Sequence, residues 1–152
     1  MSLVSKWGPH VARVVLGLPF FVIGLSHFVP FLPPQPPPPP EALPFITGLM
    51  AAGYLMPLVK LIEVVAGLAL LTNRFVPLAL TLLAPIIINI AGFHFVLAPS
   101  YPMPITFIVL SLYLAWVHRA AFAPMLRARA ASAAPAERAG ETTLPRDAVT
   151  AR

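Results

Sequence analysis

The sequence predicts an all-α protein whose fold is a bundle of four transmembrane helices. The chain has 152 residues, of which 59% are hydrophobic and only 10% are charged, whereas soluble domains are about 25% charged. Its mean hydropathy is +0.86. Four apolar segments each approach the roughly 20 residues that a helix needs to cross a bilayer. They lie at residues 11–31, 55–71, 75–97 and 105–122, so residues 1–126 form one membrane domain.

The first segment follows Lys6 and Arg13 and stays apolar as far as Leu32. It is longer than the apolar region of a signal peptide, and no Ala-x-Ala cleavage site follows it, so we expect an uncleaved first span. A stripe of small and aromatic residues with helical spacing would let another helix approach closely: Gly17, Phe21, Gly24 and His27 or Phe28.

The second segment carries Lys60 and Glu63, which share one helix face because they are three residues apart. Gly67 continues that face and permits close helix contact. The residues before this span, 45–52, are also apolar. Either the span begins earlier, or a short interfacial helix precedes it and ends near Gly53.

The loops predict the orientation of the bundle. Basic residues lie before the first span, between the second and third spans, and after the fourth, whereas the other two loops contain no lysine or arginine. The positive-inside rule then places both termini in the cytoplasm. The basic residues concerned are Lys6, Arg13, Arg74, Arg119, Arg127 and Arg129.

Two segments outside the spans have unusual composition. Pro33–Pro40 contains seven prolines and one glutamine, which favours polyproline II; we interpret it as a stiff spacer, with partner binding as the alternative. Residues 127–152 form a basic tail rich in alanine and arginine. This cytoplasmic tail has too little apolar surface to fold, so we predict disorder.

Five polar residues share the outer half of the membrane in this topology. At about 1.5 Å per residue, Lys60 lies about 8 Å below the outer end of its span, and Glu63 and Asn89 about 12 Å. His27 and His94 lie about 6 Å and 5 Å deep. His94 is about 140° around the helix from Asn89, so Asn89 is the better predicted partner of Glu63.

Two prolines lie inside predicted spans. Pro19 and Pro85 each lack an N–H and disturb the carbonyl four residues earlier. The resulting kinks would open space between helices.

The polar cluster has a structural and a functional interpretation. Lys60 and Glu63 form either an ion pair that fixes helix register or the floor of a site for a headgroup, a quinone carbonyl or a proton path. His27 and His94 either face lipid headgroups or bind quinone; haem ligation by the pair is a weaker alternative. His10 and His118 lie at the cytoplasmic ends of their spans and are predicted to be solvated.

The charges indicate a membrane surface rather than nucleic acid as the partner. The net charge is +5, but half of the basic residues lie in the tail. We expect Arg13, Arg74 and Arg119 to anchor the bundle to lipid phosphates. The chain has no cysteine, which excludes thiol relays and thiolate metal sites, and no other metal motif is present.

Three stretches follow one another along the chain: Arg13–Phe28, Gly53–Gly67 with its Glu-x3-Gly, and Leu83–Phe95. In their order and spacing they resemble the DoxX family of small four-helix bacterial membrane proteins. The resemblance covers about residues 7–126, and Ser26-His27 stands where family members often have a lysine.

The resemblance implies a location in the bacterial cytoplasmic membrane. It also implies a role near quinone chemistry, because the family is named for a membrane subunit of an archaeal thiosulfate:quinone oxidoreductase. Glu63 is the position carried over most readily. Three hypotheses remain: a quinone-linked redox subunit, a non-catalytic scaffold or accessory subunit, and a small-solute carrier. We expect a homo-oligomer or a part of a larger membrane complex.

Overall fold

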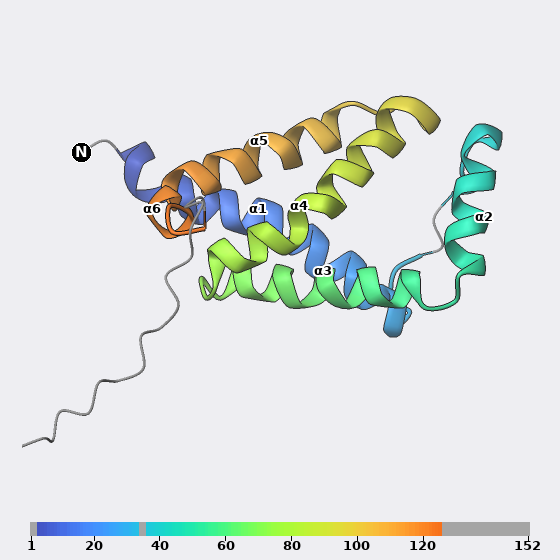
Figure 1. The fold of residues 1–152 in the computed structure, drawn as a ribbon, viewed down its shortest axis with the longest axis horizontal. Helices are drawn as coiled ribbons and strands as arrows, with labels where there is room; N and C mark the ends of the chain where they lie inside the picture. The colour runs from blue at the N-terminus through green and yellow to red at the C-terminus, as the bar shows by residue number, and fades with distance from the viewer. Residues whose placement is uncertain (1–2, 34–35, 126–152) are drawn as a thin grey trace, which may run out of the picture.

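The computed structural model describes residues 3–33 and 36–125, and every regular element in those residues is a helix. Figure 1 shows four long helices side by side and a shorter helix, α2, standing across one end. The predicted tail at residues 127–152 and part of the proline run lie outside the described residues. The elements are α1 (Leu3–Phe28), η1 (Pro40–Ala42), α2 (Leu43–Ala51), α3 (Leu55–Leu71), α4 (Val76–Gly92), η2 (Phe93–Leu97), α5 (Pro102–Val117) and α6 (Arg119–Phe122).

The first helix begins and ends earlier than predicted. Helix α1 covers Leu3–Phe28 and continues through Pro9 and Pro19, whereas the sequence predicted residues 11–31. It ends before Pro30, since the residue that precedes a proline disfavours the helical conformation. Its start extends beyond the apolar residues because backbone hydrogen bonding does not stop at a charged or polar side chain.

A short helix, α2, precedes the second predicted span, which confirms one of the two alternatives. Helices α2 and α3 meet at an angle of 90°. The chain turns at Gly53, whose φ of +69° lies in the left-handed region that glycine tolerates. Helix α3 covers Leu55–Leu71, the predicted range. Before η1, Pro39 has φ −56° and ψ 151°, close to the polyproline II conformation predicted for this run.

The second half of the molecule contains two changes of helix geometry. Helix α4 begins after Phe75, which has a left-handed backbone, and turns into the π-helical segment η2 at Phe93. Together they match the predicted third span. The fourth predicted span is divided, because the backbone of His118 leaves the helical region between α5 and α6.

The described helices are compatible with a membrane protein. Two of them, residues 7–28 and residues 76–97, are individually long and apolar enough to cross a bilayer. The bent pair α2–α3 would make a third, and α5 is apolar but has only 16 residues. The four-span topology and its orientation therefore stay predictions.

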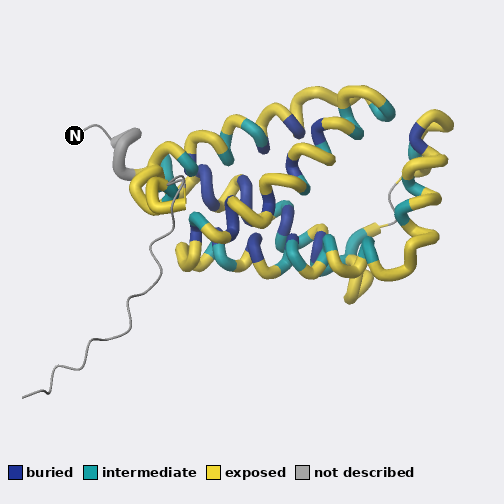
Figure 2. The backbone as a smooth tube through the Cα atoms, in the orientation of Figure 1, coloured by how far each residue is buried: buried dark blue, intermediate teal, exposed yellow. Residues whose placement is uncertain are grey.

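The core lies where all four long helices meet. Helix α1 packs on α3 and α5, and α4 packs on the same two helices. Figure 2 shows buried positions recurring along these helices, whereas α2 contains none. The largest fully buried aliphatic side chains, one from each long helix, are Leu16, Leu70, Leu83 and Leu114.

The contact between α1 and α3 is the closest in the fold. A Cβ atom on Gly67 would lie 2.6 Å from the backbone nitrogen of Phe21 and 2.8 Å from the carbonyl oxygen of Gly17. Only glycine fits there, because the atoms it would meet belong to backbone rather than to flexible side chains. Gly17 and Phe21 of the predicted stripe are thereby confirmed as part of a helix contact, whereas His27 and Phe28 at its end are exposed.

Candidate functional site

A pocket of about 470 Å³ lies between α2, α3 and α4. Helices α3 and α4 diverge from the turn that joins them, and α2 stands across the open end (Figure 1). Most of the lining is apolar, including Phe45, Ile46 and Leu49 from α2. The polar lining consists of four residues that the sequence singled out: Lys60, Glu63, Asn89 and His94.

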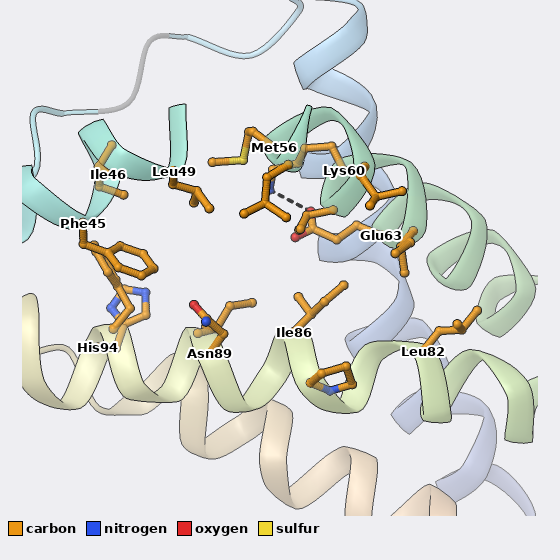
Figure 3. Close-up of a pocket in the computed structure, with 17 residues that line it drawn as sticks. Phe45, Ile46, Leu49, Met56, Lys60, Glu63, Leu82, Ile86, Asn89 and His94 are labelled. Atoms are coloured by element: carbon orange, nitrogen blue, oxygen red, sulfur yellow. Dashed lines mark hydrogen bonds and ion pairs between the residues drawn. The ribbon is translucent and has the colours of Figure 1, made fainter. Parts of the chain in front are cut away.

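Lys60 and Glu63 form an ion pair in the wall of the pocket. The Lys60 Nζ atom donates a hydrogen bond to Glu63 Oε2 at 2.8 Å. The Glu63 side chain is 5% exposed and that of Lys60 is 19% exposed. Figure 3 shows both side chains at the edge of the pocket, with the pair drawn as a dashed line. The predicted helix-face pairing is therefore present.

The second carboxylate oxygen of Glu63 opens into the pocket. No hydrogen bond reaches it in the described part of the chain. Yet no side-chain polar atom there is both fully buried and unpaired. Oε1 therefore retains some exposed surface and is free to bind a donor on a ligand.

Glycine on α1 explains why Glu63 can be buried at all. A Cβ atom on Gly24 would lie 3.1 Å from the Cβ atom of Glu63 and 3.0 Å from a methyl carbon of Val64. The carboxylate stem thus passes directly against the α1 backbone. A larger residue at position 24 would push α3 outward and expose the pair.

Asn89 points into the pocket from the opposite wall (Figure 3). Its side-chain amide makes no hydrogen bond to any residue that the structure describes, and none joins it to Glu63. The predicted partnership with Glu63 is therefore not a direct hydrogen bond, because α3 and α4 have already separated at this level. An amide without protein partners in an apolar wall provides both a donor and an acceptor.

His94 lines the same pocket, although the angular argument separated it from Asn89. Both residues reach the cavity because it extends from α3 across to α2, whose Phe45 lies beside His94 (Figure 3). A π-helical segment begins at Phe93, one residue before His94. Such segments frequently occur at functional sites. In Figure 3 the His94 ring lies beside Phe45, away from the ion pair.

Helix α2 is the part of the site that sequence reasoning missed. A short helix was anticipated before the second span, but none of its residues was assigned to the polar cluster. Phe45 packs against Phe93 with ring centroids 5.8 Å apart, which connects α2 to the end of α4. The apolar run at residues 45–52 was the available signal, since it indicated a helix with a face to bury.

His27, the fifth predicted residue, lies outside this pocket. Its ring stacks edge-on against Phe28 with centroids 5.2 Å apart, and the residue is exposed. Only His94 among the described histidines lines the pocket, so the pocket does not hold the pair of histidines that the haem alternative requires.

The three arginines expected to anchor lipid phosphates differ in their surroundings. Arg13 is only 7% exposed, and its guanidinium donates hydrogen bonds to Asn73 Oδ1 and His10 Nδ1. Arg74 and Arg119 are exposed. Arg119 stacks over the Trp116 ring, 5.1 Å from its centroid, and donates to the Trp116 carbonyl.

Searches of protein-family models, curated proteins and solved structures return no match to this chain. The fold and the site therefore define the class of protein by themselves. It is a helical protein, compatible with a membrane location, that has an apolar pocket lined by one ion pair, one amide and one imidazole.

Proposed function

We propose that this protein is a DoxX-like membrane subunit that binds a quinone or a similar lipid-soluble redox molecule in the pocket between α2, α3 and α4. The observation that carries this proposal is an apolar cavity in which Lys60, Glu63 and Asn89 present polar atoms from two diverging helices. A ligand with an apolar ring or tail and one or two carbonyl groups matches that lining.

The size and donors of the pocket support a quinone. Its volume of about 470 Å³ is within the roughly 300–1,000 Å³ of small-molecule sites. The carbonyl oxygens of a quinone accept hydrogen bonds, which the Asn89 amide and the Lys60 ammonium can donate. When bound, the quinone would supply reversible two-electron, two-proton chemistry.

The ion pair would hold the proton that such chemistry requires. Glu63 Oε1 opens into the pocket while Oε2 accepts from Lys60. A carboxylate in that position can accept a proton from a bound hydroxyl. The negative charge would then lie on the ligand oxygen, where the Lys60 ammonium could stabilise it. Intramembrane ionisable residues commonly serve proton or substrate paths.

The proposal includes a membrane topology. Four spans would place both termini in the cytoplasm of a bacterium and the pocket in the outer half of its cytoplasmic membrane. The lysines and arginines of the loops and termini, which lie at one end of the predicted spans, support this orientation.

The internal pairing of Lys60 with Glu63 favours a second candidate, a non-catalytic scaffold or accessory subunit. Because Lys60 and Glu63 already neutralise each other, the pair needs no ligand, and its role would be to fix α3 in a larger membrane complex. The pocket would then be filled by lipid, and no ligand would depend on Asn89. A small-solute carrier remains the third alternative from the sequence.

Equilibrium binding of a short-tailed benzoquinone to the purified protein in zwitterionic nanodiscs tests the proposal. We expect Asn89→Ala to weaken binding about tenfold, the equivalent of one net hydrogen bond of about 1.4 kcal/mol. The matched control is Ser111→Ala, because Ser111 lies in a separate α4–α5 groove and its hydroxyl is satisfied by the Ile108 carbonyl. The Ser111→Ala variant should bind the benzoquinone with the same affinity as the wild type.

Two results would overturn the proposal. One is the absence of saturable binding by the wild-type protein. The other is equal affinity for the Asn89→Ala, Glu63→Gln and Ser111→Ala variants, which would leave the scaffold as the better account.

A further inference from the structure

Arg13 is the buried arginine of the described chain, and the proposed quinone site does not use it. The residue is 7% exposed, whereas Arg74 and Arg119 are exposed. It lies at the end of the bundle opposite the pocket. Figure 1 shows the first turns of α1, the α3–α4 turn and α6 together at that end.

The partners of Arg13 are neutral. Its guanidinium donates to Asn73 Oδ1, 60 residues away in the α3–α4 turn, and to His10 Nδ1 one helical turn earlier. With Nδ1 accepting, the His10 ring carries its hydrogen on Nε2. These two bonds fix the guanidinium plane but use only two of its five N–H donors.

No carboxylate compensates this charge among the described residues. Their acidic residues are Glu41 and Glu63, and the ion pair they contain joins Glu63 to Lys60. Position 74, next to Asn73, carries another arginine. A buried cation with neutral partners favours an anionic ligand from outside the bundle.

The surroundings of the guanidinium indicate where such a ligand would approach. His10 and Asn73 are both exposed, so the group they hold lies directly beneath the surface. Arg13 is six residues beyond Trp7, where the membrane-length part of α1 begins. That separation is about 9 Å along the helix, within reach of the headgroup layer for a long side chain.

We propose that Arg13, oriented by Asn73 and His10, forms a binding site for a phosphate group. The planar guanidinium matches the spacing of two phosphate oxygens and can bind them through parallel hydrogen bonds. The phosphate belongs to an anionic lipid headgroup or to a soluble phosphate. This site is independent of the quinone pocket.

Asn73→Asp tests the site without removing the arginine. Aspartate keeps the acceptor that holds Arg13 and adds an internal counter-charge, so it should expel an external phosphate. We expect native mass spectrometry of the full chain, titrated with phosphatidylglycerol, to show at least tenfold weaker binding for Asn73→Asp. Its melting temperature should equal or exceed that of the wild type.

Two further variants complete the experiment. Arg13→Gln should lose binding to the same extent if it folds. Arg119→Gln removes an exposed arginine at the same end of the bundle and should change binding less than twofold. Phosphatidylcholine, which carries no net charge, should bind all variants alike.

Competition with inorganic phosphate identifies the source of the phosphate group. Displacement of phosphatidylglycerol, or phosphate-dependent stabilisation of wild type but not of Asn73→Asp, supports a soluble ligand. Lipid binding that phosphate does not displace supports a headgroup. Equal binding of both probes by wild type and Asn73→Asp would overturn the proposal and leave Arg13 as a structural clamp.

Discussion

The two ends of the helix bundle handle buried charge in opposite ways. At the arginine end, the helices stay packed, and Arg13 connects α1 to the α3–α4 turn through neutral partners. At the pocket end, α4 leaves α3, and the ion pair of Lys60 and Glu63 faces the resulting space together with Asn89. The arginine end thus contains a cation, Arg13, that no carboxylate of the described residues neutralises. The pocket end contains an ion pair in which the second carboxylate oxygen of Glu63 is free to accept a hydrogen bond.

This difference follows from where glycine occurs. Gly17 and Gly67 hold α1 against α3 by backbone contact, and Gly24 extends the contact to the level of Glu63. Helix α4 has no glycine contact of this kind; Gly92 has no atom within 4 Å of its Cβ position. Helices α1 and α3 therefore stay in contact along the molecule, whereas α3 and α4 separate and leave a pocket between them.

The largest expected effect concerns the two ends themselves, which should face opposite sides of the membrane. Because the natural chain has no cysteine, single cysteines can be placed at exposed Thr72 and Ser100. A membrane-impermeant maleimide added outside intact cells should label Ser100→Cys fully and Thr72→Cys only after lysis. Labelling of both sites in intact cells would contradict the four-span topology.

Gly67→Ala should destabilise the fold most strongly. The added methyl would meet backbone atoms of Phe21 and Gly17 at less than 3 Å, so we expect a loss of about 3 kcal/mol in the free energy of unfolding. Gly48→Ala is the matched control, because its Cβ would meet nothing within 4 Å. It should be neutral or stabilise α2 by up to about 1 kcal/mol. Equal denaturation of the two variants in detergent would refute the close α1–α3 contact.

Lys60→Met should have an intermediate effect because it leaves the buried Glu63 carboxylate without its partner. We expect a loss of about 2 kcal/mol, less than for a fully buried pair since the Lys60 side chain is 19% exposed. The double variant Lys60→Met/Glu63→Leu should recover most of that loss. Additive losses in the double-mutant cycle would show that the two side chains do not interact.

Asn89→Leu should have the smallest effect on stability. The amide makes no hydrogen bond within the described chain, so replacing it removes no protein contact, and the free energy of unfolding should change by less than about 0.5 kcal/mol. A loss above 2 kcal/mol in thermal unfolding would mean that Asn89 supports the fold rather than a ligand.

The sequence predicted the helices better than the breaks between them. Residues 55–71 were predicted correctly because Gly53 and a change in composition mark both ends. The π-helical turn at Phe93 and the interruption at His118 were not predicted, since neither has a composition signal. These irregularities depend on packing around the pocket and at the end of α5.

The same limit applies to the sites. Helical spacing was enough to place Lys60 and Glu63 on one helix face. Depth grouped them with Asn89 and His94, but also with His27, which lies outside the pocket. The contact of Arg13 with Asn73 crosses 60 residues and requires the left-handed backbone of Asn73. Neither condition can be derived from one sequence. The part played by Phe45 and Leu49 likewise depends on the 90° angle between α2 and α3.

Photo-crosslinking with an azido-benzoquinone probe, followed by peptide mapping, tests the central claim most directly. If the pocket between α2, α3 and α4 binds the ligand, label will concentrate in α2, in residues 55–63 and in residues 82–94, and excess unlabelled quinone will suppress it. Label in the α4–α5 groove around Ile108 and Leu112, or label that excess quinone does not suppress, would contradict the account.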